Sequence, residues 1–431
     1  MPTLTDDGVQ QLERLQRGSF NYFSEQTNPS NGLVRDKNAP GWPASIAAVG
    51  LALISYPVAV ERGFISRGAA VAIVLTTLRF FWNSPQGPQP DASGHHGFYY
   101  HFLDMESGRR AGACELSTID SAFLLAGALG AARYFSAIDP DEQEIGTLAD
   151  ALYRRADWQW ALNRGATVTM GWLPKRGFLK PRWHGYNEAL LLYVLGLGSP
   201  THALDPSSYQ TWCASYHWES SYGIEYLHSG ALFTHQLSHI WIDFRGIQDA
   251  FMRDKGIDYF ENSRRATLVQ QRYAIDNPGR FTGYGQYCWG ISASDGPGPA
   301  TLVIAGVKRK FFDYIARGVP YGPDDGTIAP WAVIASLPFA PEIVLPTIGF
   351  FAQAPVIGCG DGFNTAFNAT YRKPGTDQGW VSRWHFGIDQ GPVILMIENY
   401  RSGLPWRLMR QCPYISEGLR RAGFSGGWLG G

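Results

Sequence analysis

Apolar residues recur along the chain with the three-to-four-residue spacing of helices. Residues 45–62, 66–81 and 118–135 are long enough for helices, and each opens with a serine or threonine suited to cap it. Residues 186–197 are apolar on nearly every side, which is typical of a buried helix, whereas residues 141–162 keep a polar face that suits an outer helix. Further helices are expected over residues 232–241, 259–275, 328–335 and 393–400.

The order of these segments predicts the fold class. The more apolar segments alternate with the amphipathic ones, as expected where outer helices cover a ring of inner helices. We therefore expect an all-α toroid. Three loop-rich stretches, residues 85–100, 199–230 and 284–323, are expected to build one rim and to hold short β-hairpins. Because no linker or low-complexity stretch divides the chain, we expect residues 1–431 to form a single domain.

Charge excludes two classes of partner. The 36 Lys and Arg residues nearly balance the 37 Asp and Glu residues, which leaves a formal net charge of -1. Such a chain has no long-range field to attract nucleic acid or an anionic membrane, so the expected ligand is neutral. No apolar run is long enough to span a membrane, and the first residues do not resemble a signal peptide. We expect a monomer.

Aromatic residues are unusually abundant, at 14% of the chain. Several of the 15 tryptophans stand beside glycine, proline or polar residues, as expected in loops. Exposed rings in loops suit the apolar faces of sugars, although packing of the core remains an open alternative. Trp172, Trp183 and Trp289 are the candidates for the walls of a sugar site.

Cysteine and histidine spacing argues against a metal or a cofactor. The five cysteines are scattered and form no Cys-x-x-Cys pair, although one or two disulfides remain open. His95 and His96 with His101 are a weak alternative for a metal site, and a calcium site at Asp324–Asp325 is weaker still. Glycine-rich nucleotide loops and the Gly-x-Ser-x-Gly elbow are absent from the sequence.

Two carboxylates stand at the start of the helix over residues 118–135. Glu115 precedes its Ser-Thr cap and Asp120 lies in its first turn. Acidic residues at a helix start also favour the helix dipole, an alternative that accounts for Asp120 better than for Glu115. The upstream segment, residues 95–104, is dense in rings and polar groups, so His101 and Asp104 are candidates for binding a substrate.

Glu188 is the only acidic residue at the start of the apolar segment 186–197. An apolar setting raises the pKa of a carboxylic acid, which a general acid requires. Capping of the helix by Asn187 or Glu188 is the alternative. Tyr186, two residues earlier, is a candidate for contacting the same ligand.

Other polar motifs have a structural and a functional interpretation. Asp243 and Arg245 alternate, as in an ion pair or a clamp for sugar hydroxyls. Asp295 and Asp325 each precede glycine, which indicates turns or hydrogen bonds to a substrate. Asp389 is expected to satisfy a helix end.

Glu115, Asp120 and Glu188 together suit glycoside hydrolysis. In that reaction one carboxylic acid protonates the leaving oxygen, and a second carboxylate activates water or attacks the sugar. The separation of the two groups decides between inversion and retention.

The chain resembles the glucoamylase-like family, which includes the endo-β-1,2-glucanases of glycoside hydrolase family 144 and the barrel domain of cyclic β-1,2-glucan synthases. The similarity runs from about Gly32 to Tyr400. The segments that carry it are Gly32–Asp36, Ser45–Gly50, Gly97–Asp104, Glu115–Asp120, Gly185–Glu188, Gly198–Pro200, Asp243–Arg245, Asp258–Ser263, Trp289–Gly290, Asp325–Pro330 and Met396–Tyr400.

This resemblance implies an (α/α)6 barrel, a β-1,2-glucan substrate and no metal cofactor. It implies inversion for the glucanases, and retention with transfer for the synthase domains. Acidic residues that match Glu115, Asp120 and Glu188 line the cleft of the family, without deciding which is acid and which is base. Asp36 joins the candidates for substrate binding. Family members usually carry a secretion signal, so a periplasmic or secreted location is implied.

Two alternatives stay open. One is a related enzyme, either an exo-acting oligosaccharide hydrolase or a transglycosylase that acts on cyclic or substituted β-1,2-glucans. The other is a carbohydrate-binding protein without catalysis.

Overall fold

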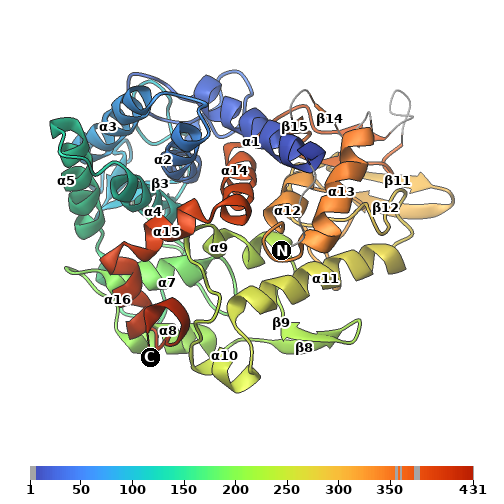
Figure 1. Ribbon diagram of the computed structural model, residues 1–431. Coiled ribbons are helices and arrows are strands. Elements are labelled where there is room, and N and C mark those ends of the chain that lie inside the picture. Colours follow the sequence, from blue (N-terminus) through green and yellow to red (C-terminus); the bar gives the residue numbers. More distant parts are fainter. Residues whose placement is uncertain (1–5, 355–357, 360–361, 373–378, 431) are drawn as a thin grey trace.

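Helices form most of the regular structure in the computed structural model, which describes residues 6–354, 358–359, 362–372 and 379–430 (Figure 1). The α-helices are α1 (Asp6–Gln26), α2 (Ile46–Glu61), α3 (Arg67–Asn83), α4 (Thr118–Tyr134), α5 (Pro140–Arg155), α6 (Trp158–Ala161), α7 (Ala189–Gly198), α8 (Pro206–Cys213), α9 (Leu237–Trp241), α10 (Ala250–Lys255), α11 (Tyr259–Asp276), α12 (Pro330–Ala335), α13 (Pro341–Gln353), α14 (Gly387–Arg401), α15 (Leu404–Arg410) and α16 (Pro413–Arg421). Two 3₁₀-helices are η1 (Leu232–His235) and η2 (Gly427–Leu429).

An inner group of helices builds the core. Helix α2 packs against α4 and α14, α4 against α7, and α12 against α14, while α9 contacts both α7 and α14. The side chain of Gln236 donates to the backbone oxygen of Ala332 at 2.6 Å and so joins α9 to α12. Figure 1 shows these helices nearer the centre and α3, α5, α11 and α13 towards the periphery. The expected division into apolar inner helices and amphipathic outer helices is confirmed.

Small residues allow α2 and α4 to pack closely. A Cβ atom at Gly50 would overlap the backbone of Phe123, and one at Gly127 would overlap the backbone of Gly50. Both helices are buried along almost their whole length. Their starts are therefore fixed relative to each other, which matters because α4 carries two candidate carboxylates.

Short strands cover one end of the inner helices, so the expectation of an all-α toroid with short β-hairpins is confirmed in part: the protein is mostly helical but also contains a larger sheet. A five-stranded antiparallel sheet has the order β2-β3-β5-β6-β7. Its strands are β2 (Gly94–His95), β3 (Phe98–Tyr100), β5 (Leu116–Ser117), β6 (Gly171–Leu173) and β7 (Gly177–Phe178). Strands this short show no alternation of apolar and polar residues, so the sequence pattern does not reveal them.

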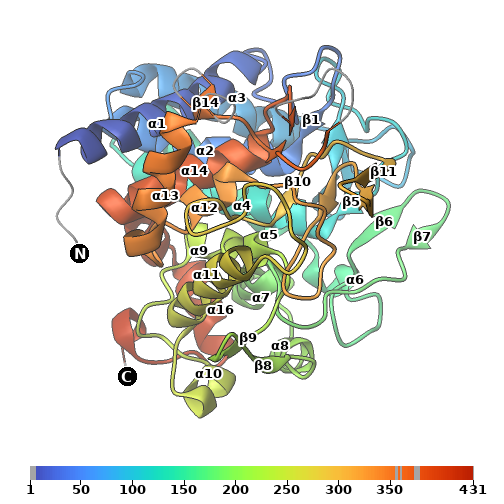
Figure 2. The ribbon, with the colours of Figure 1, turned by 90° about the vertical axis from the view of Figure 1, so that its right-hand side faces the viewer.

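The remaining strands form two-stranded ribbons. Strand β1 (Ala44–Ser45) pairs with β4 (Phe102–Leu103), β8 (Trp218–Ser221) with β9 (Ile224–Leu227), β10 (Ala293–Ser294) with β13 (Ile315–Ala316), β11 (Ala300–Ile304) with β12 (Val307–Phe311), β14 (Gly358–Cys359) with β15 (Gly362–Phe363), and β16 (Phe367–Asn368) with β17 (Trp380–Val381). The expected hairpins in the three loop-rich stretches are therefore confirmed. Strands β1 and β5 lead directly into α2 and α4, and Figure 2 shows them on the same side as β6, β7, β10 and β11.

Helix starts confirm the capping signals and correct several boundaries. Ser45, Ser66 and Ser117 accept hydrogen bonds from backbone N–H groups in the first turns of α2, α3 and α4. The single helix expected over residues 141–162 is wrong, because the chain breaks after α5 and Asp157 caps the separate α6. Helix α7 begins at Ala189, three residues later than expected, and α14 begins at Gly387, six residues earlier.

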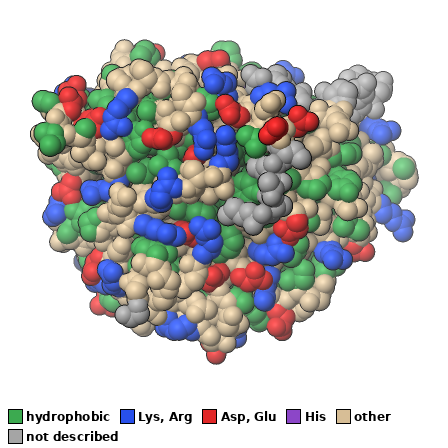
Figure 3. All heavy atoms as spheres, in the orientation of Figure 1, with side chains coloured by type: hydrophobic (Ala, Val, Ile, Leu, Met, Phe, Trp, Pro, Cys, Tyr) green, Lys and Arg blue, Asp and Glu red, His purple; other side chains and the backbone are tan. Residues whose placement is uncertain are grey.

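The surface carries both signs of charge. Figure 3 shows acidic and basic side chains interspersed over the face seen in Figure 1, as the formal net charge of -1 suggests. None of the helices in the described part of the chain is long and apolar enough to cross a membrane. Cys114, Cys213, Cys288 and Cys412 are free thiols, while the side chain of Cys359 lies outside the described residues.

Candidate active site

One histidine joins the two carboxylates at the start of α4. The Nδ1 atom of His101 lies 2.9 Å from Oε1 of Glu115, and its Nε2 atom lies 3.6 Å from Oδ2 of Asp120. Asp120 is buried, whereas about a third of the Glu115 side chain is accessible. The Oγ atom of Ser117 accepts a hydrogen bond from the backbone N–H of Asp120 at 3.2 Å, and this cap fixes the start of α4. The structure therefore brings His101, a candidate for substrate binding, into contact with both candidate carboxylates, Glu115 and Asp120.

Electrostatics divides the charges within this group. Burial alone would lower the pKa of His101, but the charge of Asp120, the hydrogen bond to Glu115 and the charge of Asp36 raise it to about 9. The imidazole is therefore a cation at neutral pH. Its hydrogen bond in turn lowers the pKa of Glu115 below the ordinary value of 4.5, which keeps that carboxylate ionised.

Glu188 stands at the N-cap position of α7 but does not cap the helix. Its side chain makes no capping hydrogen bond, and Oδ1 of Asn187 instead accepts from the N–H of Ala189 at 3.0 Å. Burial, with a smaller contribution from the charge of Asp120, raises the pKa of Glu188 to about 7. At neutral pH this group can hold a proton or release it, as a general acid must.

The start of α14 adds a second set of carboxylates. Asp389, in its first turn, is 1% exposed, and neither carboxylate oxygen has a hydrogen-bond partner among the described residues. Burial and the charges of Asp36 and Asp295 raise the pKa of Asp389 well above its ordinary range. A buried carboxyl without a partner is costly, so the interpretation of Asp389 as a helix-end group is wrong. It carries the same first-turn signal as Asp120.

Asp36 and Asp295 have polar partners of their own. Trp42 donates its indole N–H to Oδ2 of Asp36 at 3.0 Å, and Ser382 donates its hydroxyl to Oδ2 of Asp295 at 2.7 Å. Burial raises the pKa of Asp36, and the Trp42 hydrogen bond and the charge of His101 offset part of that rise. Two residues expected to bind a substrate therefore lie close to His101 and Asp389.

Tyr314 is an aromatic residue of this site that the sequence analysis missed. It lies in the loop between β12 and β13, and 43% of its side chain is exposed. Burial of its hydroxyl and the charges of Asp389 and Asp36 raise its pKa well above the ordinary value. An exposed ring beside acidic groups is suited to stack on a sugar. No local motif marks it, because only the fold brings this loop to the acidic residues.

The expected aromatic walls differ in how far they are accessible. Trp172 is partly exposed and its ring centroid lies 5.0 Å from that of His95, which leaves it available as a wall. Trp183 is only 7% exposed and donates its indole N–H to Oγ1 of Thr118 at 3.1 Å. Tyr186 is 6% exposed and stacks on Tyr259. Trp183 and Tyr186 therefore mainly hold the helix starts in position.

Two residues expected to bind a ligand, Trp289 and Asp325, belong to the core instead. Trp289 is fully buried and donates its indole N–H to Thr347 at 2.9 Å, so it cannot stack on a sugar. Asp325 forms a fully buried ion pair with Arg317, at 2.7 Å between Oδ1 and Nε. Neither burial could be read from the sequence, because a Trp-Gly or Asp-Gly pair looks the same in a loop and in the core.

Asp243 and Arg245 form an ion pair with a 2.7 Å contact between Oδ2 and Nη2, and Arg410 also contacts Asp243. Ile240, three residues before Asp243, accepts a hydrogen bond from Asn399 through its backbone oxygen. Asn399 lies near the C-terminal end of α14, whereas Asp389 lies in its first turn, so the ion pair is near the end of α14 that is opposite the candidate site. The structural interpretation of this pair is favoured over a sugar clamp. Asp104 is exposed, and its Oδ1 accepts hydrogen bonds from Ser107, which makes it part of a turn.

Metal ligation has no support in the described residues, where no three His, Cys, Asp or Glu side chains are placed to hold an ion. His96 stacks on Trp160 at 4.4 Å between centroids, away from the contacts of His101. Asp324 accepts hydrogen bonds from Tyr273 and Tyr284. The weak alternatives of metal sites at these histidines and at Asp324 are therefore not supported.

Known proteins resemble this chain over nearly its full length. A curated relative from Parabacteroides distasonis, an exo β-1,2-glucooligosaccharide sophorohydrolase (non-reducing end), is 27% identical over 450 residues that cover 97% of this chain. The chain spans 58% of that relative's length. The endo-β-1,2-glucanase of Chitinophaga pinensis, solved with sophorotriose and glucose, is 25% identical with a TM-score of 0.86, covering 99% of this chain and 100% of its own.

Family membership rests on two further similarities. A crystal structure from Bacteroides uniformis, described as a "putative glucoamylase", is 30% identical with a TM-score of 0.87 and covers 100% of both chains. The profile of the Glycoamylase family, which has the same description, matches residues 180–413, more than half of the chain. The protein therefore belongs to the Glycoamylase family.

Proposed function

We propose that the protein is a glycoside hydrolase that cleaves β-1,2-glucan. The observation that carries this proposal is that two helices in contact, α4 and α7, begin beside carboxyls in different protonation states: Glu188 has a pKa of about 7, whereas Glu115 is ionised. Glycoside hydrolysis requires these two protonation states at one pH. The substrate is inferred from the relatives in Parabacteroides and Chitinophaga, which are described as acting on β-1,2-linked glucose.

Each acidic group has a proposed role. Glu188 donates its proton to the glycosidic oxygen as the bond breaks. Glu115 acts as the base that activates water on the opposite side of the sugar, which would invert the anomeric carbon. Protonated His101 keeps Glu115 ionised, as their 2.9 Å contact supports. Asp120 is the second candidate for the base, and Asp36, Asp295 and Asp389 are proposed to bind sugar hydroxyls.

The architecture is proposed to be an (α/α)6 barrel within one domain over residues 1–431. Support comes from pairs of an inner and an outer helix, such as α2 with α3, α4 with α5 and α12 with α13. The backbone N–H of Ile46, at the start of α2, donates to the backbone oxygen of His101 at 3.3 Å, and that of Gly387, at the start of α14, donates to the backbone oxygen of Asp36 at 2.8 Å. The acidic residues at the starts of α4, α7 and α14 all belong to the same chain. Since one copy of the chain therefore supplies the whole site, we propose that the protein acts as a monomer.

Incubation with linear β-1,2-glucan tests the proposed activity. The expected result is release of short β-1,2-linked oligosaccharides, detected by chromatography, with the α-anomer appearing first in NMR spectra. The size of the early products separates endo cleavage from exo release of sophorose, since the relatives include both kinds of enzyme. Absence of cleavage of linear, cyclic and substituted β-1,2-glucans would contradict the proposal. Transfer products would instead favour a transglycosylase, and binding without turnover a carbohydrate-binding protein.

The proposed roles predict how the rate depends on pH. Glu188 must hold its proton, so kcat/KM is expected to fall about tenfold per pH unit above about pH 7. Glu115 must be ionised, and its pKa lies below 4.5, so the loss on the acidic side is expected below about pH 4.5. The pH profile of kcat/KM measures both limits. A rate that keeps rising above pH 7 would contradict the assignment of Glu188 as the acid.

A further inference from the structure

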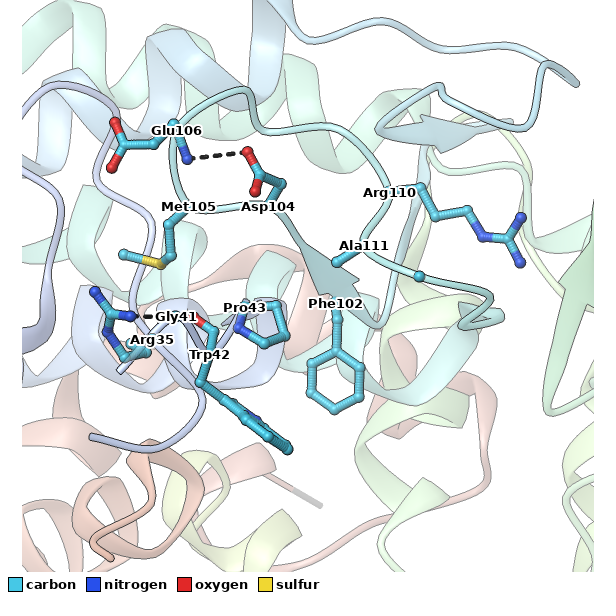
Figure 4. A pocket seen from close by; sticks show the side chains of 11 residues that line it. Arg35, Gly41, Trp42, Pro43, Phe102, Asp104, Met105, Glu106, Arg110 and Ala111 are labelled. Carbon is cyan, nitrogen blue, oxygen red and sulfur yellow. Dashed lines mark hydrogen bonds between the residues drawn. The ribbon is translucent and has the colours of Figure 1, made fainter. Parts of the chain in front are cut away.

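A cavity of about 750 Å³ opens beside the cluster of acidic residues in the candidate active site (the acidic group: Asp36, Glu115, Asp120, Glu188, Asp295 and Asp389). None of the roles proposed above involves this cavity. It lies between the loop Gly41–Pro43 and the segment that runs from Phe102 to Gly112 (Figure 4). Its volume is in the range of cavities that hold small organic ligands. Trp42, Pro43, Phe102 and Met105 provide apolar walls.

Two aromatic rings of this cavity are held in place from behind. The ammonium of Lys37 lies 3.7 Å from the centroid of the Trp42 ring, and the Trp42 N–H is bound to Asp36. Trp42 is nevertheless 40% exposed. The ring of Phe102 stacks on His101 at 4.1 Å between centroids. Rings that are already fixed lose little conformational entropy when a ligand stacks on them.

The polar edge of the cavity suits a neutral ligand. It holds two cations, Arg35 and Arg110, and two acids, Asp104 and Glu106. Both cations are already engaged with backbone oxygens, Arg35 with that of Trp42 at 3.3 Å and Arg110 with that of Cys114 at 2.7 Å. A phosphate site would present uncompensated cations. Apolar rings with a balanced polar edge instead fit a polyhydroxylated ring such as glucose.

The cavity is directly connected to the candidate active site. Trp42 hydrogen-bonds Asp36, and Phe102 stacks on the histidine that binds Glu115. The same two rings that line the cavity therefore touch residues of the acidic group. A glucan bound across the acids would reach this cavity with its next sugar units.

We propose that this cavity is a distal subsite that stacks a glucose unit on Trp42, so that the protein cleaves longer β-1,2-glucan chains more efficiently than short ones. The inference rests on the proposed function, since it concerns the same substrate. Asp36 links the subsite to the acids, so Trp42 also positions Asp36.

The test compares kcat/KM on purified β-1,2-linked oligosaccharides of increasing length. The Trp42→Ala variant removes both the ring and the N–H to Asp36. It is therefore expected to lower kcat/KM at every chain length, and by about tenfold more on long chains than on the shortest cleaved oligosaccharide, because only long chains reach the subsite. Met105→Ala is expected to change in the same direction by about threefold. Trp42→Phe keeps a ring but loses the N–H to Asp36, so it should retain most of the preference for long chains and lower kcat equally at every length.

Binding measurements make the result independent of catalysis. Calorimetric titration of the Glu188→Gln variant with a long oligosaccharide is expected to give a Kd about tenfold weaker when Trp42→Ala is added. Thermal unfolding checks that each variant is folded, and Met105→Ala serves if Trp42→Ala is not. An equal loss of kcat/KM at all chain lengths in Trp42→Ala, or an unchanged Kd, would overturn the proposed subsite. Cleavage of β-1,2-glucan by the unmodified protein would still support the proposed function in that case. An unmodified protein that neither binds nor cleaves these glucans overturns both.

Discussion

Replacing Glu188 by glutamine is expected to lower kcat on β-1,2-glucan by about 10²- to 10⁴-fold, the contribution of a positioned general acid. Glutamine has nearly the same shape but no proton to donate to the leaving oxygen. The helix should be undisturbed, because Asn187 and not Glu188 caps α7. Steady-state kinetics together with thermal unfolding measures both effects.

A matched control separates the loss of the acid from the loss of a charge. Glu225→Gln changes an exposed carboxylate in the β8–β9 hairpin and should leave the activity unchanged. An aryl glycoside with a good leaving group needs little help from an acid, so Glu188→Gln should lose much less activity on it than on glucan. If Glu188→Gln keeps its activity on glucan, the acid lies elsewhere, and Asp389, whose pKa is raised by burial, becomes the first alternative.

The candidate acids could be predicted because their signals are local. Glu115, Asp120 and Glu188 each stand beside the start of an apolar helix, and the expected starts of these two helices, α4 and α7, lie within three residues of the observed ones. Asp389 has the same signal, but α14 was expected to begin only at residue 393, which placed Asp389 outside the helix. An error of a few residues in a helix boundary thus removed a buried carboxyl from the site.

The aromatic residues could not be ranked from the sequence. Trp42, Trp183 and Trp289 all stand in polar or glycine-rich surroundings, yet their exposed fractions are 40%, 7% and 0%. What separates them is which distant segment covers each ring, as helix α13 does for Trp289 through Thr347, whose hydroxyl accepts the indole N–H at 2.9 Å. Contacts over such sequence distances leave no local pattern. The same reason explains why the short strands beside α2 and α4 were missed.

Replacing Asp325 by asparagine is expected to lower the free energy of unfolding by about 3–5 kcal/mol, the usual effect of removing one partner of a buried ion pair. Arg317 is fully buried, and Asp325 is its only carboxylate partner among the described residues. The change leaves the guanidinium as an uncompensated charge, although backbone oxygens of Ser294 and Phe312 still accept its hydrogen bonds. For a chain of 431 residues this corresponds to a Tm lower by about 3–6 °C.

Two comparisons decide whether Asp325 supports the fold or binds the substrate. Asp313→Asn changes an exposed carboxylate near the same loop and should alter the stability by less than about 0.5 kcal/mol. Arg317→Met added to Asp325→Asn removes the stranded charge, so part of the lost stability should return. A substrate-binding aspartate would give the opposite pattern, with a raised KM, an unchanged Tm and no recovery in the double variant. The Arg317–Asp325 ion pair is fully buried, whereas Asp389 at the start of α14 has no hydrogen-bond partner among the described residues. We therefore expect the free energy of unfolding to depend on Asp325, and the activity to depend on the carboxylates at the starts of α4, α7 and α14.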